Sequence, residues 1–263
     1  MRVLAITNQK GGVGKTTTSV NLSACLAAQG QRVLMIDLDP QGNATTGSGI
    51  FKREALPSVY QMLIGNATLD QVRIKTEFGY DVLPANRELA GAEVELIEID
   101  QRETRLKSEL AKVAGDYDYV LIDCPPALNL LTVNGLVASN AVIIPMQCEY
   151  YALEGLTDLV TTLRKVRANL NPALEIEGLL RTMYNPQSTL TQQVSGELES
   201  HFGEKVYTTL IPRNVRLAEA PSYGKPVIAF DRASRGAQAY MSLAEEMLAR
   251  HARGTGQGPA GLQ

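Results

Sequence analysis

The segment Lys10–Thr17 reads KGGVGKTT, and it limits the possible fold more than any other part of the chain. An apolar run precedes it, and a helix-like segment, Ser19–Gln29, follows it. A strand, a glycine-rich loop and a helix in this order form a phosphate-binding loop. Glycines without Cβ atoms let backbone N–H groups face phosphate oxygens, and the positive end of the helix dipole adds to the attraction. We therefore expect phosphate contacts from Gly11, Gly12, Gly14 and Thr17.

Two further residues of this loop have predicted roles. Lys15 is expected to place its charge on the β- and γ-phosphates, and the Thr16 hydroxyl to bind Mg²⁺. The usual spacing, G-x-x-x-x-G-K-[ST], requires a glycine at position 9, where this chain has Gln9. The loop is therefore a variant, and it also carries a second lysine, Lys10.

The second lysine lies close to the expected triphosphate. A positive group there can stabilise the charge that develops in phosphoryl transfer, as an arginine finger does. Because Lys15 already fills the site within its own chain, we predict that Lys10 acts across a dimer on the partner's nucleotide. The alternative for Lys10 is an ordinary solvated loop lysine.

Apolar runs alternate with helix-like stretches along the rest of the chain. The candidate strands are Arg2–Thr7, Arg32–Asp37, Tyr80–Leu83, Tyr119–Asp123, Ala141–Met146, Ile176–Thr182, Val206–Ile211 and Val227–Ala229. Several are apolar throughout, so both of their faces should be covered. We predict an α/β fold with a doubly wound, mostly parallel sheet and helices on both faces. Residues 1–250 should form a single P-loop domain, and the glycine-rich tail, 251–263, should be disordered.

Aspartates end two of the expected strands, at the edge where doubly wound sheets bind their ligands. Asp37 and Asp123 each follow a run of apolar strand residues. A carboxylate in this position holds Mg²⁺, usually through a water, so we assign that role to Asp123 and consider Asp37 for the same shell. Asp39 follows in a proline–glycine loop and is the best candidate to orient an attacking water. The alternative for Asp39 is a turn residue or helix cap, since D-P-Q-G favours turns.

Composition restricts the partners of the chain. Its 44% hydrophobic and 20% charged residues are ordinary for a soluble globular protein, and a net charge of −3 gives no global sign of nucleic-acid binding. No stretch approaches the ~20 apolar residues of a membrane span. The first expected strand follows Met1 directly, so we expect no signal peptide. The three scattered cysteines are expected to be reduced thiols of a cytoplasmic protein.

Basic residues gather in one late segment, which carries Glu219 and Asp231 as its acids. They are Arg213, Arg216, Lys225, Arg232 and Arg235. A local patch of this kind can bind phosphates despite the acidic total, and its affinity should fall with salt. The alternative is that these are ordinary solvated charges.

Five motifs together resemble one protein family. KGGVGKTT, DLDPQGN, LIDCPP, EYYALEG and IPRNVRLAEAPSYGKP are similar to those of the ParA/Soj family of chromosome- and plasmid-partitioning ATPases, in the deviant Walker A group of P-loop proteins. The resemblance runs from Arg2 to about Arg250. The loop motif alone would indicate only the wider group, which includes the MinD division regulators. The last two motifs indicate the chromosomal Soj branch more narrowly.

The resemblance implies ATP and Mg²⁺ as cofactors and hydrolysis of ATP to ADP and phosphate. It implies a homodimer that forms with ATP, in which Lys10 reaches the other subunit's phosphates and Asp39 supports hydrolysis. The purine pocket of the family falls on the segment containing Pro212 and Asn214. Glu149 lies toward the nucleotide in relatives.

The resemblance also implies partners and a place in the cell. The ATP dimer would bind DNA without sequence preference, with Arg216 contributing, and a ParB/Spo0J-type centromere-binding protein would stimulate turnover. The protein would then be cytoplasmic and associated with the nucleoid. A second family arginine falls near Gln187 of this chain. Candidates to replace it are Arg181 and the cluster of Arg164, Lys165 and Arg167.

Other members of the same group supply alternative functions. A MinD-like membrane-cycling ATPase needs a C-terminal amphipathic helix with bulky apolar residues, which the tail HARGTGQGPAGLQ lacks, so we expect no membrane partner. An ATPase that positions another cargo is a further alternative. The sequence leaves both chromosomal and plasmid cargo open.

Overall fold

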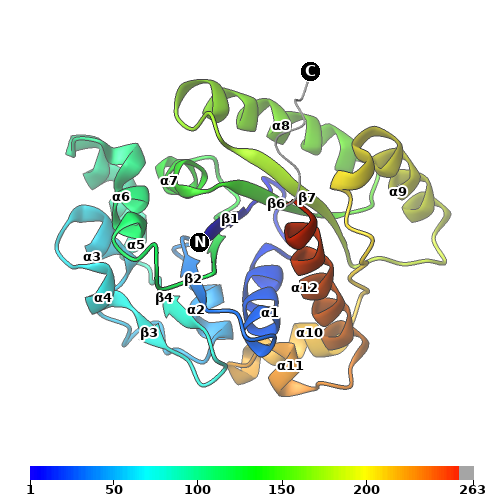
Figure 1. The fold of residues 1–263 in the computed structure, drawn as a ribbon, viewed down its shortest axis with the longest axis horizontal. Coiled ribbons are helices and arrows are strands. Elements are labelled where there is room, and N and C mark those ends of the chain that lie inside the picture. Colours follow the sequence, from blue (N-terminus) through cyan, green and yellow to red (C-terminus); the bar gives the residue numbers. More distant parts are fainter. Residues whose placement is uncertain (255–263) are drawn as a thin grey trace.

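The computed structural model describes residues 1–254 and, within them, a single sheet of seven strands in the order β3-β4-β2-β5-β1-β6-β7 (Figure 1). The strands are β1 Arg2–Ile6, β2 Val33–Asp37, β3 Ile74–Lys75, β4 Asp81–Leu83, β5 Tyr119–Asp123, β6 Ala141–Gln147 and β7 Glu175–Thr182. Neighbouring strands run parallel, except that β3 is antiparallel to β4. The predicted mostly parallel α/β sheet is confirmed.

Helices connect the strands. They are α1 Lys15–Ala28, α2 Asn43–Gly47, α3 Val59–Ile64, α4 Leu69–Val72, α5 Leu89–Glu95, α6 Arg105–Ala111, α7 Leu130–Ala138, α8 Ala152–Asn169, α9 Thr189–Phe202, α10 Val215–Glu219, α11 Val227–Phe230 and α12 Arg235–Gly254. Short 3₁₀ turns cover Leu96–Glu98, Arg102–Thr104, Gly203–Lys205 and Ala220–Tyr223.

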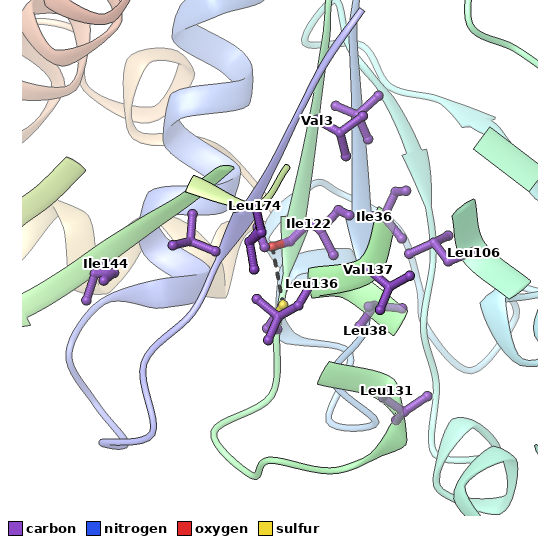
Figure 2. Packing of buried hydrophobic residues seen from close by; sticks show 14 of the residues in the cluster. Val3, Ile36, Leu38, Leu106, Ile122, Leu131, Leu136, Val137, Ile144 and Leu174 are labelled. Atoms are coloured by element: carbon purple, nitrogen blue, oxygen red, sulfur yellow. Dashed lines mark hydrogen bonds between the residues drawn. The ribbon is translucent and has the colours of Figure 1, made fainter. Parts of the chain in front are cut away.

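Successive residues of the central strands pack into two separate apolar clusters. In β1, Val3 lies in a cluster with residues of α3 to α9, whereas Leu4 lies in a cluster with residues of α1, α2 and α10 to α12. Figure 1 shows α7 and α8 on one side of the strands and α1 and α12 on the other. In Figure 2, Ile36 and Ile122 of the sheet lie beside Leu136 of α7. Both faces of the sheet are covered, which explains why its strands lack a polar alternation.

Two predicted strands are wrong. The segment Val206–Ile211 joins β7 only through isolated pairing, in which Val206 bridges Leu179. Residues 227–229 lie in helix α11, which begins after Pro226 and whose first N–H donates to Asn21 Oδ1 of α1 at 2.7 Å. A short apolar run suits a strand and a buried helical turn equally, so only the partner across the fold decides between them.

The end of the domain also differs from expectation. Residues 251–254 continue α12 rather than belonging to a disordered tail, and His251 there bonds both Tyr119 and Glu177. Residues 255–263 lie outside the described part of the chain. Within residues 1–254, no helix is both long and apolar enough to cross a membrane. All three cysteines are buried and free, as expected of reduced thiols.

Candidate functional site

The loop between β1 and α1 has an open inner side. Gly12 and Gly14 adopt φ angles of 73° and 89°, a left-handed conformation that favours glycine. A Cβ atom built on Gly11 or Gly12 would meet no described atom within 4 Å. Gly14 precedes the first turn of α1, and no described side chain caps that end of the helix. Uncapped N–H groups beside open space fit a phosphate chain.

Lys15 lies inside this loop and is only 7% exposed. Its Nζ donates to the carbonyl oxygen of Lys10 at 3.0 Å. Burial lowers the pKa of Lys15, while the nearby charges of Asp123 and Asp39 oppose that change. A buried ammonium aimed at the loop is well placed to meet the negative charge of a nucleotide.

The two strand-end carboxylates lie side by side. Asp37 of β2 pairs in register with Asp123 of β5, and both are buried. The carboxylate of Asp123 accepts from the Thr16 hydroxyl and from the Ser19 hydroxyl, each at 2.9 Å. The carboxylate of Asp37 accepts from the backbone N–H and the hydroxyl of Thr45 at 2.8 and 2.7 Å. Thr16 in the first turn of α1 therefore lies beside the paired carboxylates at the carboxyl ends of β2 and β5, and the binding of Mg²⁺ by these residues stays a prediction.

Burial raises the pKa of both carboxyls, and the charge of Asp37 adds to the rise at Asp123. Two carboxylates held together away from water repel each other, and a divalent cation beside Thr16 and Asp123 would remove that cost. No three His, Cys, Asp or Glu side chains within residues 1–254 form a metal cage. The donors present suit Mg²⁺, which one or two carboxylates hold together with substrate phosphates. Both oxygens of Asp37 and both oxygens of Asp123 already accept from protein donors, so each carboxylate suits a position that reaches the cation through a water.

Asp39 lies in a tight turn just beyond β2. Its Oδ1 accepts from the N–H of Gln41 at 2.9 Å, and its carbonyl accepts from the N–H of Gly42 at 2.8 Å. The turn interpretation and the catalytic one are therefore compatible. The turn holds the carboxylate near enough to Lys15 for its charge to act on that lysine.

Lys10 and Glu149 meet at the open side of the loop. Lys10 Nζ lies 2.6 Å from Glu149 Oε2, and the two side chains are 45% and 51% exposed. Glu149 follows β6, so it reaches the loop from the neighbouring strand. Tyr150 and Tyr151, which come next, are among the most exposed large apolar side chains of the described chain.

The predicted purine segment lies beyond the end of β7. The hydroxyl of Thr182 donates to the carbonyl of Val13 at 2.8 Å, which joins this strand to the phosphate loop. Pro212 then pairs with Tyr184, two residues farther along. Asn214 caps α10 by accepting from its Leu217 N–H at 3.3 Å. No described hydrogen bond joins Pro212 or Asn214 to the loop, so their contact with a purine stays a prediction.

The candidate DNA residues are separate from this site. Arg216 on α10 is about half exposed and forms ion pairs with Glu219 at 2.8 Å and Asp231 at 3.2 Å. Arg181 is only 4% exposed and donates to Ser195 and to the carbonyl of Tyr207, so it does not replace the missing arginine near Gln187. The remaining candidates are exposed on α8, and they are Arg164, Lys165 and Arg167.

Sequence reasoning missed two residues of the site. Ser19 holds Asp123 together with Thr16, and Thr45 holds Asp37. Ser19 lies three residues after Thr16, the spacing that brings side chains to one face of a helix, and this could have revealed it. No local sequence pattern marks Thr45, because its contact with Asp37 depends on how α2 packs against β2.

Known proteins resemble this chain over most of its length. A family model described as AAA domain matches residues 1–176. The chain is 55% identical over 249 residues to the sporulation initiation inhibitor protein Soj of Bacillus subtilis, covering 94% of this chain and 98% of that protein. It is 52% identical to the chromosome partitioning protein ParA of Caulobacter vibrioides, covering 95% of each. A solved structure of cobyrinic acid a,c-diamide synthase from Mycobacterium smegmatis, with bound ADP and magnesium, is similar with a TM-score of 0.85 and 38% identity over the whole of both chains.

Proposed function

This chain belongs to the ParA/Soj family of chromosome-partitioning ATPases, and we propose that it works as an ATP-dependent dimerising switch for DNA partitioning. As a member of that family it is an ATPase that uses ATP and Mg²⁺. The observation that carries the proposal is the half-exposed Lys10 in a loop whose own phosphate lysine, Lys15, is already buried in place.

Each residue of the site has a role in this proposal. The loop glycines and Lys15 bind the β- and γ-phosphates, and Thr16 and Asp123 hold Mg²⁺, which neutralises phosphate charge when bound. Asp39 orients the water that attacks the γ-phosphate. Asp37, fixed by Thr45, keeps the Asp39 turn next to that water, because its Oδ1 accepts from the N–H of Asp39 at 3.1 Å.

The Lys10–Glu149 pair is suited to exchange partners when a second subunit arrives. An ion pair between exposed side chains contributes at most ~1 kcal/mol, so its opening costs little. Lys10 then reaches the phosphates of the partner, where the gain is larger because the contact is enclosed. Tyr150, Tyr151 and Leu128 are exposed beside the carboxyl ends of β5 and β6, and they supply the apolar contacts that an interface between two copies needs.

The proposed DNA surface comprises Arg216 with the exposed basic residues of α8. Their ion pairs with phosphates would be sequence-independent and weakened by salt. A ParB-type partner then stimulates hydrolysis and releases the dimer, and the protein is associated with the nucleoid in the cytoplasm. In the ATP site, the segment that contains Pro212 and Asn214 contacts the purine base of the bound nucleotide.

The test is ATP turnover measured alone, with DNA, with the ParB-type partner, and with both. We expect stimulation by both together to exceed the sum of the two separate effects. Anionic lipid vesicles form a further arm, because a MinD-like ATPase would be stimulated by them with its own partner. Turnover that responds to vesicles and not to DNA would overturn the partitioning proposal in favour of that alternative.

A further inference from the structure

The turn that carries Asp39 is held from outside by a lysine. Lys52 Nζ donates to the carbonyl oxygen of Gln41 at 2.6 Å. The N–H of the same Gln41 donates to Asp39 Oδ1 at 2.9 Å. Two peptide groups, one on either side of the Gln41 Cα atom, therefore connect the Lys52 ammonium to the Asp39 carboxylate.

The other side of the turn is closed by backbone. Gly42 has a φ of 61°, and a Cβ atom built on it would lie 2.6 Å from the carbonyl oxygen of Ala85. The same Cβ would lie 3.0 Å from Cδ of Lys52. The stem of Lys52 thus covers Gly42 while its ammonium reaches Gln41, so the turn lies between the Ala85 backbone and this one side chain.

Lys52 is presented by an ordered segment. It lies between α2 and α3, where the N–H groups of Glu54 and Ala55 donate to the carbonyl of Phe51 at 2.9 and 3.2 Å. Ala55 is buried, which anchors this second turn to the core. A lysine loses rotamer freedom when it is held in one direction, and a charge-assisted hydrogen bond offsets that loss.

We propose that Lys52 is a positioning residue for ATP hydrolysis, because it holds the Gln41 carbonyl and so keeps Gln41 in the place from which its N–H orients the Asp39 carboxylate. The inference rests on the proposed role of Asp39 in orienting the attacking water. Reaction geometry of this kind must be held within about 0.5 Å, and a turn that is free to move would not supply it. Lys52 itself touches neither nucleotide nor water in this proposal.

The activity test compares Lys52→Met with Lys52→Arg, which keeps the cation and its donors. Arg53→Met is the matched control, since it removes a neighbouring exposed cation. We expect Lys52→Met to lower kcat roughly tenfold or more with KM for ATP within about twofold of wild type. Lys52→Arg should recover most of the rate, and Arg53→Met should be unaffected. A kcat for Lys52→Met equal to that of wild type would overturn the inference.

A second readout does not depend on turnover. Amide hydrogen exchange of the nucleotide-free protein should become faster at Gln41 and Gly42 in Lys52→Met and stay unchanged in Arg53→Met. Unchanged exchange in Lys52→Met would also overturn the inference. Asp39→Ala distinguishes a failure of the proposed function from a failure of this inference. If Asp39→Ala hydrolyses ATP normally, the proposed role of Asp39 is wrong. If Asp39→Ala is inactive while Lys52→Met is fully active, only the role of Lys52 is wrong.

Discussion

Lys10 and Glu149, which are 139 positions apart in the chain, form an ion pair with 2.6 Å between Nζ and Oε2. The pair keeps the second lysine of the loop at the surface and within its own subunit. Because both side chains are about half exposed, this contact is easily exchanged for a stronger one. In the proposed switch, the Lys10 ammonium would therefore have two positions, one on Glu149 and one on the phosphates of the partner subunit.

Replacement of Lys10 tests that exchange. Lys10→Ala should bind Mg·ATP as a monomer with nearly wild-type affinity, because Lys15 still supplies the in-chain charge. It should fail to form the ATP dimer in light scattering and should lose stimulated hydrolysis. Glu149→Gln is the control, since it frees Lys10 and should leave dimer formation intact. A Lys10→Ala dimer that hydrolyses ATP normally would return Lys10 to a solvated loop lysine.

Replacement of Lys15 tests the phosphate loop. Lys15→Ala removes the buried ammonium from the loop and should weaken Mg·ATP binding by about a hundredfold or more, as expected for a desolvated charge interaction of about 3 kcal/mol. Titration calorimetry measures the affinity, and thermal unfolding verifies that the variant is folded. Full affinity in a folded variant would contradict the assignment of the loop.

Replacement of Asp39 separates binding from hydrolysis. Asp39→Ala should bind ATP normally and lower turnover by a factor of about 10² to 10⁴, the usual effect of removing a residue that acts on the attacking water. The ATP dimer should therefore persist in size-exclusion chromatography. A variant that stays monomeric with ATP, or that hydrolyses it at the wild-type rate, would show that Asp39 has another role.

Arg216 tests the DNA surface. Arg216→Glu should weaken binding to every DNA sequence and reduce the slope of log affinity against log salt by about 0.9 for each phosphate that the arginine neutralises. Its partners Glu219 and Asp231 would then lie beside a third acid, which adds repulsion. Arg53→Glu makes the same charge change elsewhere and should have no such effect. Equal DNA affinity in both variants would leave Arg216 an ordinary paired surface charge.

The pKa of Glu177 predicts how the free energy of unfolding depends on pH. Burial alone would raise its pKa, but hydrogen bonds and charges from His251 and Arg2 outweigh that and hold the pKa at about 2, below the ordinary 4.5. A lowered carboxyl pKa stabilises the fold fully above 4.5 and loses that contribution as the pH falls toward 2.

The measurement is the free energy of unfolding in urea for wild type and Glu177→Gln at several pH values. We expect the difference between them to be largest at pH 7 and to shrink by most of its value at about pH 3. A difference that stays constant over this range would show that Glu177 acts through shape and not through its charge.

Much of the site could be predicted because its parts are contiguous. The glycine positions before Lys15, and the carboxylates that end β2 and β5, each follow from a few neighbouring residues. Parallel strands place their carboxyl ends at one edge, so Asp37 and Asp123 were expected at the same edge, and they meet because β2 and β5 are neighbours in the sheet. The resemblance to the family then implied the same roles for Lys10 and Asp39 that their positions in the sequence had already suggested.

Other parts depended on contacts between distant segments. Residues 227–229 became a helix because Asn21 of α1 accepts their first N–H, and Arg181 is buried rather than a surface cation because α9 covers it. Neither fact has a local signal, since a short apolar run suits a strand and a buried helical turn equally, and an arginine can be solvated or buried with partners.

The amino-acid sequence is enough to predict a phosphate loop with two lysines, a mostly parallel sheet and carboxylates at strand ends, because each of these follows from a short local pattern. The residues that hold those groups in place are found only in the folded chain. Glu149 pairs with Lys10 and Lys52 holds the Asp39 turn because the order of strands brings loops together that are far apart in the chain.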